Sequence, residues 1–94
     1  MAEVIFLDEA QDDLIKKGLE YKLDSNQRQE ISDLIEKLKN NPTAGKKKNM
    51  PLMTDFVIEK HIGKQVFCCF YYDVTRRLSV TSVRIKRVSI AYKF

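Results

Sequence analysis

The sequence predicts an α+β domain in which two N-terminal helices pack on a mainly antiparallel sheet, in the order β-α-α-β-β-β. A short run of β-branched and aromatic residues opens the chain. Two stretches with helical spacing of apolar residues follow, and after Pro51 the apolar residues recur at every second position. A chain of 94 residues has room for one core, so we expect a single domain spanning residues 1–94.

The first strand and the first helix are expected between Glu3 and Tyr21. The segment from Glu3 to Leu7 has the composition of a strand, and Asp8 is placed to cap the helix that follows. One face of this helix carries Ala10, Leu14, Gly18 and Tyr21.

The second helix is expected to end before Pro42. Asp24 and Gln27 resemble a capping box, with Ser25 as a competing cap. Apolar residues then recur at the spacing of a buried helix face: Ile31, Leu34, Ile35 and Leu38. The helix stops at Asn40-Asn41-Pro42, because the residue before a proline is driven out of the α region.

The second half of the chain is expected to form three antiparallel strands joined by short turns. We place the strands at 56–62, 64–72 and 78–85, the turns at Gly63 and 73–76, and a loop at 43–54. A β-bulge near Thr81 and Ser82 would reconcile a change of parity in the last strand. The helix-free face of the sheet is expected to carry Glu59, His61 and a subset of the C-terminal basic residues.

Charge is divided unevenly between the two halves. Residues 1–45 hold 6 basic and 10 acidic residues, a net charge of −4, whereas residues 46–94 hold 11 basic and 3 acidic residues, a net charge of +8. This asymmetry favours a polyanionic partner, nucleic acid, over a basic surface that only keeps the protein in solution. We expect contacts with an RNA backbone from Lys46, Lys47, Lys48, Lys64 and Lys86.

Membrane insertion, export and metal binding are not expected. The longest apolar stretch, at 66–72, is far shorter than the ~20 residues of a spanning helix, and the N-terminus has no export pattern. Cys68 and Cys69 are adjacent, so in a strand they point to opposite faces and neither pair nor chelate together. We expect a reduced, cytoplasmic protein that uses no metal and no cofactor.

Several segments together resemble the RelE/ParE family of bacterial toxins. Val4-Ile5-Phe6-Leu7 with Glu9-Ala10 and Asp13-Leu14 is similar to the family's opening strand and helix, and Asn41-Pro42-Thr43-Ala44-Gly45-Lys46 with Lys48-Asn49-Met50-Pro51 to its helix end and basic loop. Gly63 before Val66-Phe67-Cys68-Cys69-Phe70-Tyr71 resembles its glycine turn and apolar strand, and Lys86-Arg87 with Tyr92 its C-terminal basic pair and tyrosine.

The resemblance implies the toxin of a toxin-antitoxin system, held inactive by a cognate antitoxin protein. RelE-type members cleave messenger RNA at the ribosome and inhibit translation, whereas ParE-type members inhibit DNA gyrase without enzymatic activity. Val57 and Glu59 stand where the family has sheet-face lysines, and Val66 stands near its arginine. Some relatives with ribosome-dependent activity use a glutamate and a histidine instead, which Glu59 and His61 could imitate.

Metal-independent RNA cleavage needs a base for the 2′-hydroxyl, a cation for the phosphorane and an acid for the 5′-oxygen. Glu59 or His61 could serve as the base, and the other of the two or Tyr92 as the acid. Arg84 or Arg87 could hold the phosphate. We therefore expect an endoribonuclease acting on messenger RNA. The alternatives are a ParE-type gyrase inhibitor and a small nucleic-acid-binding module without toxicity. Convergence of these side chains in one concave site separates the enzyme from the module.

Overall fold

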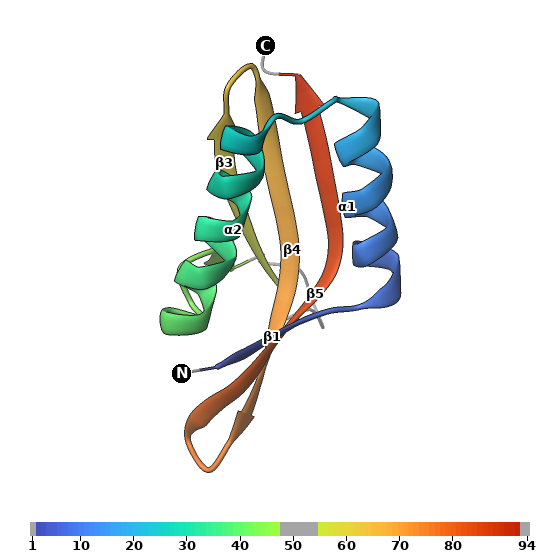
Figure 1. Cartoon of the computed structure of the whole chain (residues 1–94). Coiled ribbons are helices and arrows are strands. Elements are labelled where there is room, and N and C mark those ends of the chain that lie inside the picture. Colours follow the sequence, from blue (N-terminus) through green and yellow to red (C-terminus); the bar gives the residue numbers. More distant parts are fainter. Residues whose placement is uncertain (1, 48–54, 93–94) are drawn as a thin grey trace.

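Two helices lie on one face of a five-stranded sheet in the computed structural model, which describes residues 2–47 and 55–92 (Figure 1). In chain order the elements are β1 (Glu3–Phe6), α1 (Asp8–Glu20), α2 (Ser25–Asn40), β2 (Lys46–Lys47), β3 (Phe56–Ile62), β4 (Gln65–Arg76) and β5 (Ser79–Tyr92). The α+β prediction, with two N-terminal helices on a mainly antiparallel sheet, is therefore confirmed.

The strands are ordered β1-β5-β4-β3-β2. The first strand runs parallel to β5, and every other neighbouring pair is antiparallel. The short strand β2 lies in the stretch predicted as a loop. The sequence does not reveal this strand, because two residues are too few to show the periodicity of a strand. Its position is fixed by Gly45, whose N–H donates to the Tyr71 hydroxyl oxygen at 2.9 Å.

The two helices begin in different ways. Asp24 caps α2 in a full capping box with Gln27, as the sequence predicts. The prediction that Asp8 caps α1 is wrong: the N-cap is Leu7, and Asp8 is the first helical residue. There its carboxylate stabilises the positive end of the helix dipole instead. Within the described residues, neither helix is long and apolar enough to cross a membrane.

The core lies between the helices and the sheet. Its fully buried side chains come from both layers and include Leu38 of α2, Ile62 of β3, Phe67, Cys69 and Tyr71 of β4, and Val83 and Ile85 of β5. Burial raises the pKa of Cys69 to about 12, so this thiol stays neutral and behaves as a small apolar side chain.

Gln27 joins the start of α2 to the β3–β4 turn. Its side-chain amide donates to the Ile62 carbonyl at 2.8 Å and to the Gln65 side-chain oxygen at 2.6 Å. The predicted turn at Gly63 is present, with a φ of +66° that glycine adopts without strain. A side chain at this position would also press on Gln27, since an added Cβ would lie 3.1 Å from its amide nitrogen.

The β4–β5 hairpin is longer than the sequence predicts. The predicted turn at 73–76 is part of β4, and the turn lies at Arg77 and Leu78. A bulge at Thr81 is present as expected, because Val74 pairs with Ser82 and Thr75 with Val80. A second register shift, where Phe70 pairs with Arg87 and Tyr71 with Ile85, leaves Lys86 as an extra residue in β5.

The end of β4 and the start of β5 project from the rest of the molecule as a two-stranded ribbon (Figure 1). We call residues 73–81 the hairpin arm. The described part of β3 reaches no further along β4 than Tyr71, and β1 pairs with β5 only at residues 82–85. Thr81 stabilises the arm through its hydroxyl, which donates to the Val74 carbonyl at 3.1 Å.

Replacing Leu38 by alanine should strongly destabilise the fold. Leu38 is fully buried, so Leu38→Ala should lower the free energy of unfolding by about 2–5 kcal/mol, through lost burial and a cavity. The matched control is Leu19→Ala, because Leu19 is 71% exposed; its effect should stay within about 0.5 kcal/mol. Urea denaturation measures both, and equal losses would contradict this assignment of the core.

Candidate nucleic-acid interface

The face of the sheet opposite the helices is formed by alternate residues of β3, β4 and β5. Register determines which ones, because paired residues share a face and neighbours along a strand alternate. Ile58, Cys69 and Val88 are paired across the sheet and buried under the helices. The residues on either side of them therefore point away. We call this surface the open face. Its members include Val57, Glu59, His61, Val66, Cys68, Phe70, Tyr72, Arg84, Arg87 and Ser89, together with Lys86, the extra residue of a bulge in β5.

Glu59 and His61 both lie on the open face and are exposed, which agrees with the predicted strand pattern. Glu59 pairs with Cys68, and Cys68 pairs with Ser89, so the three side chains form one row across the sheet. Burial and, next, the negative charge of Glu59 raise the pKa of the Cys68 thiol. This thiol is therefore a poor nucleophile at neutral pH.

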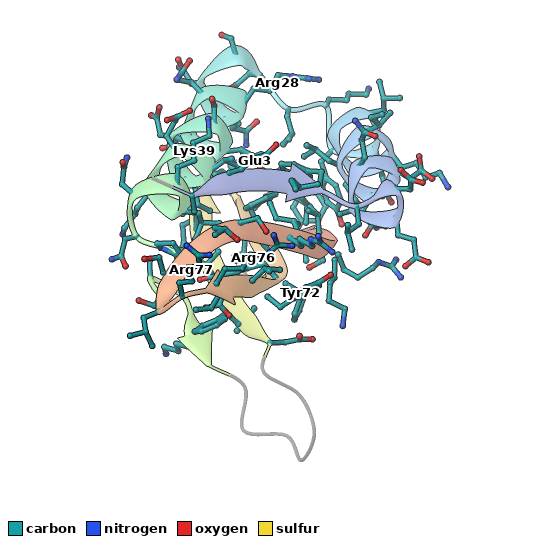
Figure 2. The ribbon with its side chains drawn as sticks, turned by 90° about the horizontal axis from the view of Figure 1, so that it is seen from below. Glu3, Arg28, Lys39, Tyr72, Arg76 and Arg77 are labelled. Carbon is teal, nitrogen blue, oxygen red and sulfur yellow. The ribbon has the colours of Figure 1, made fainter. Side chains whose placement is uncertain are left out.

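Tyr72 and Arg84 form a second row on the open face, at the end of the sheet nearest the hairpin arm. They are a cross-strand pair, so their side chains are neighbours. Arg76 follows Tyr72 on the same side of β4, four residues further into the arm. Figure 2 shows Tyr72 on the side of the sheet away from the helices. This group combines an aromatic ring with guanidinium groups on one surface.

Lys86 reaches across the open face to Asp55, just before β3. Its ammonium nitrogen lies 3.0 Å from a carboxylate oxygen of Asp55, whose side chain is only 16% exposed. The bulge at Lys86 directs the side chain toward this carboxylate. The charge of Lys86 is therefore neutralised within the protein, which reduces its value for the predicted RNA contact.

Arg87 is bound to α1. Its guanidinium donates two hydrogen bonds to the Asp13 carboxylate, at 2.7 and 3.0 Å, and lies 3.8 Å from Glu9. Asp13 also accepts from the Val88 N–H at 3.1 Å. The hydrogen bonds from Arg87 hold the pKa of Asp13 below its usual value, and the Val88 N–H adds to this effect. The guanidinium group of Arg87, which was expected to hold a phosphate, is therefore already bound to a carboxylate.

Tyr92 lies away from Glu59 and His61. It pairs with the buried Gln65, so it belongs to the helix side of the sheet. Its ring meets that of Tyr21, at the end of α1, edge to face with 5.0 Å between the centroids. The structure therefore does not bring this tyrosine to the surface that carries the candidate base.

The predicted lysine contacts are dispersed. Lys46 is exposed at the start of β2, and Lys64 is exposed in the β3–β4 turn at the far end of the sheet. The backbone of Lys47 lies in β2, and Lys48 falls outside the described residues.

The predicted catalytic residues do not converge. Strands lie about 4.8 Å apart and rise about 3.3 Å per residue. Arg84 and His61 are two strands apart, and their rows are separated by the offset between Tyr72 and Val66. Their backbones are therefore about 20 Å apart, which is too far for both to act on one phosphate. Of the five candidates, the structure brings together only Glu59 and His61.

Tyr72, Arg76 and Arg77 were not among the residues that the sequence singled out. A strand predicted to end at Tyr72 places the two arginines in or after a turn, where they have no defined face. The available signal was alternation: aromatic or apolar residues at Tyr72 and Val74 alternate with polar ones at Asp73 and Thr75, as in a continuing strand.

A groove of about 620 Å³ separates α1 from α2 on the other side of the molecule. Its lining is largely apolar and includes Leu14, Ile15, Leu19, Ile31 and Ile35. Ile15 and Leu19 are 58% and 71% exposed. This is a second surface of distinct chemistry.

Comparisons with known proteins identify no relative for this chain. No family model matches it, and no curated protein or solved structure matches it either. Across residues 2–47 and 55–92, no group of three or more His, Cys, Asp or Glu side chains is placed to hold a metal ion.

The Asp13–Arg87 contact should make stability depend on pH. A carboxylate whose pKa is lowered by folding stabilises the native state above its unfolded pKa of ~3.9, and this contribution disappears as the pH falls through the folded value. Asp13→Asn should therefore lower the melting temperature at neutral pH, and the difference from wild type should shrink below about pH 3. Asp12→Asn, an exposed neighbour on α1, is the control. Parallel melting curves for both variants at all pH values would contradict the assignment.

Proposed function

We propose that the protein binds single-stranded RNA on its open face, through Tyr72 and the arginines beside it. The observation that carries this proposal is the position of Tyr72 between Arg84, across the sheet, and Arg76, along β4. Aromatic rings on a sheet surface stack with unpaired bases, and neighbouring cations contact the phosphates. The cytoplasm, where messenger RNA is accessible, is the proposed compartment.

The charges that remain unpaired support this surface over the rest of the basic half. Arg76 and Arg84 form no ion pair within the described residues, whereas Lys86 is bound to Asp55 and Arg87 to Asp13. Internal carboxylates thus neutralise the cations at the centre of β5. Arg76, Arg77 and Arg84 are exposed cations at the end of the sheet that carries Tyr72.

RNA is preferred to DNA on chemical grounds. Further along the open face, the rows at Cys68 and Val66 offer polar groups, Ser89, Glu59 and His61, that can exchange hydrogen bonds with a 2′-hydroxyl. DNA of the same sequence lacks the 2′-hydroxyl. Binding to single-stranded RNA and to DNA of the same sequence therefore measures the contribution of these rows.

Tyr72→Ala and Arg84→Ala should both weaken RNA binding. Loss of a base–aromatic stack lowers affinity roughly five- to a hundredfold, and Arg84→Ala should reduce the dependence of log affinity on log salt by ~0.7. Fluorescence anisotropy with a labelled, unstructured RNA between about 50 and 200 mM salt measures both.

Lys16→Ala is the matched control for charge. Lys16 is exposed on α1, on the other side of the molecule, and its removal changes the net charge by the same amount as the removal of Arg84. It should leave affinity and salt slope close to those of wild type. Equal losses in Lys16→Ala and Arg84→Ala would mean that binding is non-specific and would reject the open face as the site.

A toxin that cleaves messenger RNA is the second candidate, favoured by the position of Glu59 and His61 on one exposed face. Histidine titrates near neutral pH, and a carboxylate two residues away can orient it. In this proposal the open face binds the message at the ribosome, and the apolar groove between α1 and α2 gives a cognate antitoxin a surface to cover.

His61→Ala should slow cleavage of a ribosome-bound message roughly 10²–10⁴-fold, the usual contribution of a general acid or base. Lys60→Ala is the control, because Lys60 is exposed on the same strand but belongs to the opposite face. Single-turnover cleavage by folded variants provides the measurement. Full activity in His61→Ala would remove the histidine from the mechanism, and gyrase inhibition without RNA cleavage would replace this candidate by a ParE-type inhibitor.

A further inference from the structure

The tip of the hairpin arm exposes an apolar side chain next to two cationic ones. Leu78 is 101% exposed, more than any other large apolar residue that the structure describes. Arg76 and Arg77 precede it and are exposed as well. The arm holds this tip away from the helices and from the other strands (Figure 1). Leu78 therefore makes no contribution to the core.

The backbone of the tip is unfavourable for the residues that occupy it. Arg77 has a φ of +52° and Leu78 a φ of +67°. Two consecutive positive φ values mark a type I′ turn, for which Asn-Gly is the favoured sequence. A leucine in the left-handed region is strained, and full exposure provides no burial that would compensate. Folding alone does not account for Arg-Leu at these positions.

We propose that the arm is a pin that recognises the junction between an RNA duplex and the single strand held on the open face. In this arrangement Leu78 stacks on the terminal base pair, and Arg76 and Arg77 contact phosphates of the two strands where they separate. The proposal rests on the proposed function and names its substrate class: single-stranded RNA that adjoins a stem.

The geometry connects the two surfaces. Arg76 lies on the same side of β4 as Tyr72, and the tip follows directly. Arg76, the last residue of β4, lies four residues beyond Tyr72, about 13 Å, and the turn at Arg77 and Leu78 follows it. A single strand crossing Tyr72 and Arg84 toward the arm therefore meets Arg76 before the tip, without turning to another face of the molecule.

A junction suits an apolar wedge better than an internal base step does. Insertion between stacked pairs requires unstacking, which opposes binding. At a junction the terminal pair already exposes one face, so an apolar side chain covers it without separating bases. The two cations beside the wedge, Arg76 and Arg77, can then approach the diverging backbones, where negative charge is dense.

The turn sequence allows a test that separates binding from folding. Arg77→Asn/Leu78→Gly installs the sequence that the backbone prefers, so the double variant should melt at the same temperature as wild type or higher. Leu78→Asn keeps Arg77 and removes only the apolar group, at a residue type that tolerates positive φ. Both variants leave Tyr72 and Arg84 unchanged.

The probes are an unstructured RNA, the same RNA extended by a stem of about ten base pairs, one turn of duplex, and the blunt stem alone. Wild type should bind the stem–strand junction roughly tenfold more tightly than the single strand, within the range of one stacking contact. Both tip variants should lose this preference and keep their single-strand affinity within about twofold.

The outcomes separate the pin from the function on which it depends. Intact single-strand binding without a junction preference in wild type, or an unchanged preference in both tip variants, overturns the pin alone. Absence of single-strand binding overturns the proposed function and the pin together. Vesicles containing anionic lipid serve as a further probe. Tip-dependent binding to these vesicles, without any junction preference, would assign the hairpin arm to a membrane surface and overturn the proposal.

Discussion

The pairing of β4 with β5 is the interaction on which the rest of the structure depends. This hairpin forms the centre of the sheet, and β1 and β3 each pair with one of its strands. Both helices pack on the face that it presents through Phe67, Cys69 and Tyr71. Because strands pair with a period of two, one register fixes which side chains enter the core and which remain on the open face. The interface and the core are thus two consequences of the same pairing.

The two bulges in β5 change that pairing locally, and the chemistry of the surface follows. Lys86 is the extra residue of one bulge and is bound to Asp55, whereas the next residue, Arg87, pairs with Phe70 and is bound to Asp13. Each cation stabilises the fold by joining β5 to another element. The basic half of the sequence therefore contributes to tertiary structure at the centre of β5 and becomes available to ligands only toward the arm.

The sequence predicted the elements well because their periodicities are strong. Residue types and their spacing predict both helices, the Gly63 turn and the α2 capping box. They also predict that Glu59 and His61 lie on the face of the sheet that points away from the core. The site was harder to predict, because membership of a face does not determine position along it. Glu59, His61 and Arg84 share a face, yet the register places Arg84 about 20 Å from His61. Asp13, which accepts the hydrogen bonds of Arg87, lies 74 residues away in sequence, and no local pattern predicts such a contact.

The length of the hairpin was underestimated for a related physical reason. Asp73, Thr75 and Arg76 are polar, and polar clusters after an apolar strand usually mark a turn. In a two-stranded ribbon exposed on both faces, however, polar residues are compatible with strand structure, since neither face requires burial. The chain continues as β4 and turns where Arg77 and Leu78 must both adopt positive φ. Local preference and observed structure disagree at these two residues, which are also the ones that no internal contact explains. A disagreement of this kind is expected where side chains act on a partner rather than on the fold.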